Sequence, residues 1–368
     1  MQRWALESLV TAGRERFKKL VKRYRLAHPN HEIHFLARDK EDWLLAGCQS
    51  LLAGIYVPYF IKRLHVKDET IDQLTIPDRI FQWLLLQQIK TTFKHVINPH
   101  CYHIEGPNGV RRATRAILTK LNEKKPAYII RADIKSFYRS IPHTKLLQTL
   151  KQAYQDPRVH RFFEQIIRNP IETPRGYKNP DHGIPIRGPL SPFFSALYLK
   201  PLDDAFTGTE VSYYRYQDDI LILCQTKRQY QCSRRRLSLI LKERQLNLSS
   251  KKTRMGRIEK GFHYLGIDYP GTQTRDKKEL PAPHLHRRTL RNARLQVKQM
   301  VTDGFSALQI KTYLRRWTSW WEQVLAAKSA PPQLAWSSLG ASRLPVRASL
   351  PPGEEATVAR SPRFRHAV

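Results

Sequence analysis

The sequence is poor in the features that mark several large classes of protein. Its 368 residues include only four cysteines, and none of them forms a Cys-x-x-Cys pair, which argues against a zinc ribbon and a disulfide framework. No run of about 18 apolar residues is present, so we expect no membrane-spanning helix. Residues 1–22 mix basic and acidic side chains without an apolar stretch. We therefore expect no secretory signal and a cytoplasmic location.

Acidic residues are also scarce. The chain has 31 Asp and Glu against 64 Lys and Arg, which gives a formal net charge of +33. The basic excess is spread along the chain, so a polyanion is the expected partner, and nucleic acid is the leading candidate. A chain of this length can bury at least one large core, and two or three subdomains are expected.

One acidic stretch stands out from this basic background. An aromatic run, Tyr213–Tyr216, and an apolar run, Ile220–Cys224, flank Gln217, Asp218 and Asp219. The pattern predicts a buried β-hairpin with two carboxylates at its tip. Taken alone, it fits either a polar turn whose acids face water or a site where a divalent cation neutralises adjacent charges.

A second strand also ends on an acid. Residues Tyr128–Ile134 form a mostly apolar run that contains Asp133, and a helix is expected from about His143 to Tyr154. A carboxylate at the end of such a strand lies at a sheet edge, where ligands commonly bind. Between the two acidic sites, Gly183–Pro192 is a Gly/Pro loop. This loop fits either a connector or a close backbone approach to a base or sugar.

The remaining segments are expected to be mainly helical. The apolar spacing predicts helices within residues 1–60 and over 78–94, 193–202 and 227–246, and a hairpin with a charged tip within 53–77. The Trp-rich segment 313–321 fits nucleic-acid contacts or a packed helical bundle. His95, His100, Cys101 and His103 could in principle bind zinc, although loop histidines and a half-buried cysteine explain them as well.

The acids, the Gly/Pro loop, a later lysine and the basic chain together suggest phosphoryl transfer. Two cations bound by carboxylates can activate a primer 3′-hydroxyl and stabilise departing pyrophosphate. Oxygen ligands and a phosphate substrate favour Mg²⁺ or Mn²⁺. A hydrolytic nuclease would use the same groups, so these residues alone leave both reactions open.

The ordered motifs resemble those of reverse transcriptases. Asp133–Ile141 resembles their first palm motif, Tyr216–Asp219 their Tyr-x-Asp-Asp signature, and Gly183–Pro192 their template-handling loop. Lys252-Thr253 is similar to the lysine motif, and Phe262–Gly266 to the primer-grip turn. The resemblance implies an α+β, right-hand polymerase fold. We expect fingers with a helical N-terminal region at 1–127, a palm with an antiparallel sheet at 128–270, a short helical thumb at 271–328 and a basic, Pro-rich tail at 329–368.

The resemblance also implies residue roles. Asp133, Asp218 and Asp219 are expected to bind the metals, with Asp219 least directly engaged, and the Ile134 carbonyl is expected to add a ligand. Tyr138 is the expected steric gate against a ribose 2′-hydroxyl, with core packing as the alternative. Lys252, or Lys251 if the register shifts by one, is the expected acid toward pyrophosphate. The expected nucleotide contacts are Lys62, Arg63, Lys67, Ile186 and Arg187, and the expected primer or template contacts are Gln217, Gly188, Leu265 and Gly266.

Three departures from the family pattern bear on function. Ile186-Arg187 stands where relatives carry a Pro-Gln-Gly loop, and Gln217 stands where many carry Ala. The arginine expected near Asp72 is not evident. The resemblance implies RNA-directed synthesis of DNA from deoxynucleoside triphosphates. The altered loop keeps untemplated or simple-repeat synthesis as an alternative, and a silent nucleic-acid-binding scaffold and an RNA polymerase are the others.

The biological setting follows from the same resemblance. No Cys/His endonuclease module is evident after the thumb-like helices. This favours a stand-alone bacterial enzyme of a retron, diversity-generating or phage-defence system. A dedicated non-coding RNA or a protein could be an additional partner, and no membrane partner is expected.

Overall fold

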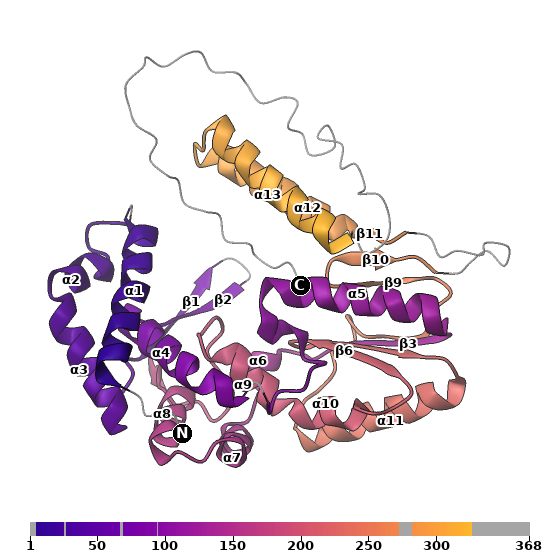
Figure 1. Cartoon of the computed structure of the whole chain (residues 1–368), viewed down its shortest axis with the longest axis horizontal. Helices are drawn as coiled ribbons and strands as arrows, with labels where there is room; N and C mark the ends of the chain where they lie inside the picture. The colour runs from indigo at the N-terminus through magenta and orange to yellow at the C-terminus, as the bar shows by residue number, and fades with distance from the viewer. Residues whose placement is uncertain (1–4, 26, 67–68, 94, 272–281, 326–368) are drawn as a thin grey trace. The chain divides into compact units, whose positions relative to one another are not determined.

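The computed structural model describes residues 5–25, 27–66, 69–93, 95–271 and 282–325, and the predicted tail at 329–368 lies outside them. Helices and strands follow one another in mixed order along the chain (Figure 1). The helices of the described part are α1 (Leu6–Tyr24), α2 (Glu32–Arg38), α3 (Lys40–Ala53), α4 (Ile76–Phe93), α5 (Pro107–Lys124), α6 (Phe137–Ser140), α7 (His143–Ala153), α8 (Pro157–Ile167), α9 (Ser191–Tyr198), α10 (Lys200–Phe206), α11 (Lys227–Glu243), α12 (Arg287–Thr302) and α13 (Ala307–Leu325), with a 3-10 helix at Tyr102–Glu105.

The strands form three sheets. Their orders are β2-β1-β4-β5, β6-β7-β3-β8 and β11-β10-β9. The bounds are β1 (Ile61–Val66), β2 (Glu69–Gln73), β3 (Tyr128–Asp133), β4 (Ile171–Thr173), β5 (Gly176–Lys178), β6 (Ser212–Tyr216), β7 (Asp219–Cys224), β8 (Arg254–Arg257), β9 (Phe262–Tyr264), β10 (Ile267–Tyr269) and β11 (His284–Leu285). The predicted α+β class is confirmed.

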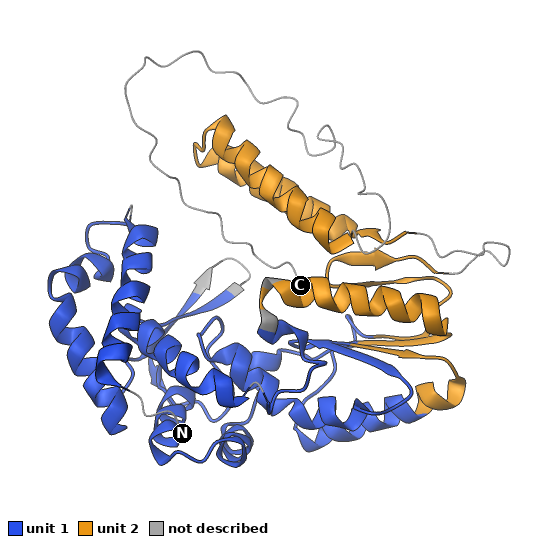
Figure 2. Ribbon diagram, in the orientation of Figure 1, with its two compact units in different colours: residues 1–104, 132–220, 232–253 blue, residues 105–131, 221–231, 254–368 orange. Residues whose placement is uncertain are grey.

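The chain divides into two compact units (Figure 2). The first comprises residues 1–104, 132–220 and 232–253. The second comprises residues 105–131, 221–231 and 254–368. The aspartates of the predicted metal site all lie in the first unit.

The helical opening of the first unit is confirmed. Helix α1 carries Leu9, Phe17 and Leu20 on one buried face, and this apolar stripe packs against α3 and α4. Where α3 passes α4, Gly47 lies against the Phe81 ring, and a β-carbon at Gly47 would come within 2.0 Å of that ring. The close packing of these two helices therefore depends on glycine at this position.

The predicted hairpin in 53–77 is shorter than expected. The apolar run before Ile61 is extended but is not a strand, because its backbone groups bond to side chains instead of a neighbouring strand. The Tyr59 amide donates to Asp78 at 3.2 Å, and the Tyr59 carbonyl accepts from Asn169 at 2.6 Å. Pro58 also lacks the amide hydrogen that a central strand needs.

The helix predicted over 193–202 is also corrected. Helix α9 ends at Tyr198, and α10 begins at Lys200. Pro201 lies in the first turn of α10, where its missing N–H is tolerated. Within a continuous helix, that proline would remove one backbone hydrogen bond and clash with the preceding turn.

The second unit contains the C-terminal helices. Helices α12 and α13 pack around a small apolar core, and α13 also contacts α5. Trp317 and Trp321 are buried. Of the two sequence-based interpretations of the Trp-rich segment, core packing therefore describes these two side chains. No helix in the described residues is both long and apolar enough to span a bilayer.

Candidate active site

Adjacent strands bring the predicted metal ligands to one end of a sheet. Asp133 is the last residue of β3, and Asp219 is the first of β7. The two strands are neighbours, and the Ala127 amide at the start of β3 donates to the Cys224 carbonyl at the end of β7. Because the strands run antiparallel, Asp133 and Asp219 lie at the same end. The predicted hairpin with acids at its tip is confirmed.

The pKa of Asp218, at the tip of the hairpin, is raised mainly by burial. Partial burial, followed by the nearby Asp133 carboxylate, raises the pKa of Asp218 to about 6, and Lys252 and Arg215 only partly offset this. Asp133 itself is 4% exposed. Three carboxylates and one lysine lie at this end of the sheet, so the site contains more negative charge than its own lysine neutralises, as expected of a cation-binding site.

Lys252 is the lysine placed at the acids. Its Nζ lies 2.9 Å from Oδ1 of Asp133. The preceding loop fixes this position, because the Ser249 amide donates to the Asp133 carbonyl at 2.7 Å and the Lys135 amide donates to the Asn247 carbonyl at 2.8 Å. Ile134 lies between these two bonds, in an antiparallel bridge with Leu248.

Tyr138 lies beside the same acids. Its ring is partly buried and packs edge-on against Phe137 at a centroid distance of 5.6 Å. Burial raises the pKa of Tyr138 to about 12, with Asp218 adding to the increase and a hydrogen bond with Ser195 opposing it. The hydroxyl is therefore protonated near neutral pH, and the ring position is fixed from both ends.

The Gly/Pro loop forms a tight turn around Arg187. The Gly188 amide donates to the Pro185 carbonyl at 3.2 Å, and Arg187 has a φ of 73° in the third position of this turn. Glycine usually occupies that position. The Arg187 side chain is exposed, and Gly188 is buried.

A buried acid ties this loop to the β1–β2 hairpin. The Ile186 amide donates to Asp72 at 3.0 Å. Asp72 also accepts from Arg63, its cross-strand neighbour, at 2.7 Å. Arg63, one of the predicted nucleotide contacts, is thus ion-paired with Asp72. Lys62 is exposed on the same strand, whereas Lys67 lies outside the described residues.

The predicted primer-grip turn belongs to the second unit. Leu265 and Gly266 both have positive φ, 50° and 80°, and link β9 to β10. A β-carbon at Gly266 would lie 2.9 Å from the Thr289 hydroxyl and 3.1 Å from the Trp321 ring. Glycine is therefore required for both the turn and its packing against α12 and α13.

Sequence reasoning missed the buried groups behind the hairpin tip. Arg215 is fully buried and makes a bidentate ion pair with Asp203, with Nη2 at 2.6 Å. His103 is also buried, and its Nδ1 accepts from the Gln217 amide at 3.1 Å. Burial, reinforced by Arg215, lowers the pKa of His103 to about 3. Cys101 lies in this network, 3.2 Å from Arg215 Nη2, rather than in a zinc cluster.

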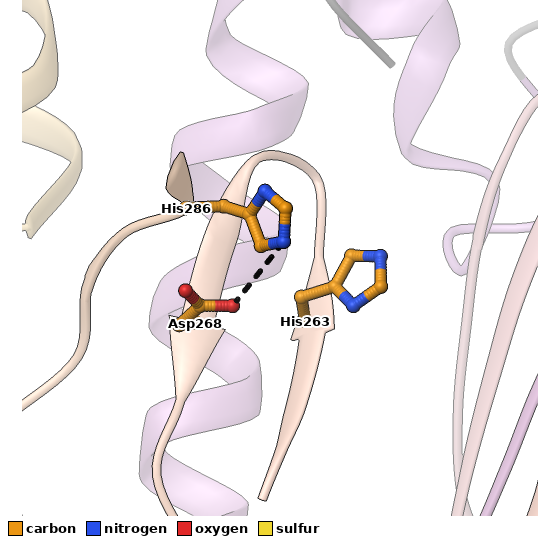
Figure 3. Close-up of side chains that lie close together, drawn as sticks. All are labelled: His263, Asp268 and His286. Carbon is orange, nitrogen blue, oxygen red and sulfur yellow. Dashed lines mark ion pairs between the residues drawn. The ribbon is translucent and has the colours of Figure 1, made fainter. Parts of the chain in front are cut away.

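Sequence reasoning also missed a histidine cluster in the second unit. The ligand atoms of His263, Asp268 and His286 lie within 4.8 Å of one another (Figure 3). However, His286 Nδ1 accepts from the Arg288 amide at 3.0 Å, and His263 Nε2 lies 2.5 Å from Arg131 Nη1. An imidazole needs a lone pair to bind a metal. Both lone pairs are engaged here by donors, so this cluster does not suit a cation.

Comparison with known proteins identifies the family of the chain. The sequence matches the family described as reverse transcriptase (RNA-dependent DNA polymerase) over residues 70–269, more than half of the chain. The chain therefore belongs to the reverse transcriptase family. The matched residues include the three aspartates, Lys252 and the primer-grip turn.

Individual relatives are distant. The chain is 23% identical to protein YkfC of Escherichia coli (strain K12) over 259 residues, which are 59% of this chain and 68% of YkfC. It is 26% identical to an uncharacterized 91 kDa protein in the cob intron of Schizosaccharomyces pombe over 182 residues, 50% of this chain and 22% of that protein.

Similar solved structures include telomerases. Apo telomerase from Candida tropicalis matches with a TM-score of 0.48 and 13% identity, covering 74% of this chain and 57% of the telomerase. The same enzyme with the TWJ fragment of telomeric RNA gives a TM-score of 0.45 and 12% identity, covering 69% and 50%. The chain thus spans about half of these telomerases, and the scores are too low to add to the family assignment.

Proposed function

We propose that this chain is an RNA-directed DNA polymerase that adds deoxynucleotides to a 3′-hydroxyl by two-metal phosphoryl transfer. The observation that carries the proposal is geometric: Asp133 ends β3, Asp219 begins the neighbouring strand β7 directly after Asp218, and Lys252 Nζ lies 2.9 Å from Asp133. Excess carboxylate charge at a sheet edge in a chain of net charge +33 suits a cation together with a nucleic acid.

Oxygen donors dominate the site, so Mg²⁺ or Mn²⁺ fits it best. Asp133 and Asp218, with Asp219 and the Ile134 carbonyl as further ligands, would bind the ions. When bound, such ions lower the pKa of the attacking hydroxyl and stabilise charge on the transferred phosphoryl group.

The chain's own residues supply positioning and a proton. Lys252, whose Nζ lies 2.9 Å from Oδ1 of Asp133, would protonate the departing pyrophosphate. The Tyr138 ring, fixed against Phe137 and Ser195, excludes a ribose 2′-hydroxyl and selects deoxynucleotides.

Primer extension tests the proposal. Purified protein, Mg²⁺, a primed RNA template and labelled deoxynucleotides are expected to give extension products, and Asp218→Asn is expected to abolish them. Failure of the unmodified protein to extend any RNA or DNA primer with Mg²⁺ or Mn²⁺ would contradict it. Tyr138→Ala is expected to admit ribonucleotides, and its failure to do so would remove the steric-gate role.

A second candidate is untemplated or simple-repeat DNA synthesis at the same site. The exposed Arg187 in a left-handed turn favours it, because a charged side chain there changes how a template base would be received. Sequencing products made with and without added RNA distinguishes the two. Faithful copies of the added RNA exclude the second candidate.

The biological setting is proposed from the same family resemblance. We propose a bacterial retroelement or phage-defence system, with a dedicated RNA as the template. Sequencing nucleic acid that copurifies with the protein tests this. One abundant, defined RNA supports it, and a mixture that mirrors total cellular RNA contradicts it.

A further inference from the structure

Gln217 has an unusual backbone conformation at a critical place. It immediately precedes Asp218, and its φ is 54°. A non-glycine residue in the left-handed region costs about 1 kcal/mol and persists only where its surroundings enforce it. Whatever enforces φ at Gln217 also fixes the direction in which the next residue leaves the strand.

Buried groups contact both sides of Gln217. His103 Nδ1 accepts from its amide at 3.1 Å, and Arg215 Nη1 donates to its carbonyl at 3.1 Å. Arg215 is anchored by the Asp203 carboxylate, and both side chains are at most 1% exposed. The peptide groups flanking Cα of Gln217 are therefore each bonded to a side chain that water does not reach.

The His103 ring has a defined tautomer. Its Nε2 lies 2.9 Å from the Pro192 carbonyl, which can only accept, so Nε2 carries the hydrogen. Its Nδ1 therefore has the lone pair that the Gln217 amide requires, and Cys101 Sγ lies 3.4 Å from the same nitrogen. Nε2 is also 3.3 Å from the hydroxyl of Ser195, which bonds to Tyr138.

We infer that His103 is a positioning residue for the proposed metal site: its Nδ1, with Arg215, keeps Gln217 left-handed and thereby aims Asp218 at the cation. Through Pro192 and Ser195 the same ring connects the acid-bearing turn to the start of α9 and to Tyr138. This inference rests on the proposed function, because it assigns a purpose to the direction of Asp218.

Two amide variants separate the two hydrogen bonds of His103. In His103→Asn the amide oxygen can replace Nδ1 as the acceptor for Gln217, whereas the bond to Pro192 is lost. In His103→Gln the amide nitrogen can replace Nε2 as the donor to Pro192, whereas the acceptor for Gln217 is lost. A purely structural role makes the two variants equivalent or favours His103→Gln.

The expected order of kcat is wild type, then His103→Asn, then His103→Gln, with about tenfold or more between the two variants. The KM for deoxynucleotides is expected to change less than about threefold. Thermal unfolding midpoints, measured in parallel, show whether the variants are equally folded. Equal kcat values, or a lower kcat for His103→Asn, would overturn the inference.

Manganese binding gives a readout that does not need turnover. Electron paramagnetic resonance titration with Mn²⁺ is expected to show weaker binding in His103→Gln than in His103→Asn. If the wild type made no DNA but the variants kept this order of binding, the polymerase proposal would fail and the positioning role would stand. Identical Mn²⁺ affinities would overturn the positioning role.

A glycine at position 217 provides a further check. Glycine adopts positive φ without the steric cost, so dependence on His103 is expected to shrink. The loss caused by His103→Gln is expected to be smaller in a Gln217→Gly background than in the wild type. An equal loss in both backgrounds would contradict the proposed action through Gln217.

Discussion

Gln217 and Arg187, each in a turn of the first unit, are non-glycine residues with positive φ, and the surroundings of these two turns differ. Gln217 has its amide and carbonyl bonded to buried His103 and Arg215. Arg187 has an exposed side chain, and its turn is bonded through the neighbouring Ile186 amide to Asp72. The first turn is fixed at Gln217 itself, which suits a following residue, Asp218, whose carboxylate must have a fixed orientation to bind a cation. The second is fixed beside its central residue, at the Ile186 amide.

The largest expected effect comes from removing the anchor of the first turn. Asp203→Asn leaves the buried Arg215 charge uncompensated, so the free energy of unfolding is expected to fall by about 3–5 kcal/mol. Asp204→Asn is the matched control. Asp204 pairs with Lys200 and is half exposed, so its loss is expected to cost about 1 kcal/mol or less. Urea unfolding measures both variants. Equal decreases in the free energy of unfolding for Asp203→Asn and Asp204→Asn would contradict the role of Asp203 as a buried anchor.

The acid next to the first turn predicts a pH dependence. Because the folded pKa of Asp218 is raised to about 6, the folded protein binds more protons than the unfolded chain between about pH 4 and 6. When a chelator removes divalent cations, the contribution of Asp218 to the free energy of unfolding therefore falls as pH rises through this window, by on the order of 2 kcal/mol. Mg²⁺ is expected to raise the melting temperature more at pH 7 than at pH 5.

Asp218→Asn is the reference for that pH dependence. In the variant, stability is expected to lose the part of its pH dependence that is due to Asp218. Mg²⁺ is expected to raise the variant's melting temperature much less than that of the wild type. Melting temperatures of both proteins across this pH range, with and without Mg²⁺, measure the two effects. Parallel slopes for the variant and the wild type would show that Asp218 is not the titrating acid.

A smaller effect is expected for the anchor of the second turn. Asp72→Asn keeps one acceptor but loses the charge that Arg63 and the Ile186 amide share. The expected cost is about 1–3 kcal/mol, with a raised KM for deoxynucleotides because the loop loses its attachment. Chemical unfolding and steady-state kinetics measure the two quantities. An unchanged KM would show that this attachment does not affect nucleotide binding.

The smallest expected effect is at the exposed turn itself. Arg187→Gly places glycine where φ is 73°. Relief of backbone strain is expected to raise the free energy of unfolding by about 0.5–1 kcal/mol. The larger conformational entropy of the unfolded glycine variant offsets part of this gain. Differential scanning calorimetry measures the change. A clear destabilisation would show that the Arg187 side chain makes an important contact within the folded chain.

The sequence was sufficient where the signal is local. The apolar run Ile220–Cys224 and the strand before Asp133 predicted the hairpin and the second strand, whereas the meeting of the acids was implied by the family resemblance. The break between α9 and α10 also had a local signal in Pro201, but the apolar periodicity on both sides outweighed it. The late start of the β1–β2 hairpin, at Ile61, had a similar signal in Pro58.

The supports of the acid-bearing turn could not be predicted in this way. Arg215 sits in an aromatic run, where a cation suggests an exposed position, and its burial depends on Asp203 in another element. The bond between His103 and Gln217 joins residues 114 positions apart. No periodicity or spacing encodes such a pair, because the tertiary fold alone brings it together.

The central claim is that the acids at the ends of β3 and β7 form the polymerase site. The most direct measurement is extension of a primed RNA by the wild type and Asp218→Asn, with Glu259→Gln as a carboxylate-to-amide control on the exposed Glu259, which pairs with Arg257. We expect the wild type and the control to incorporate deoxynucleotides equally, and Asp218→Asn to be at least about 1,000-fold slower. Equal extension by all three proteins would contradict the claim.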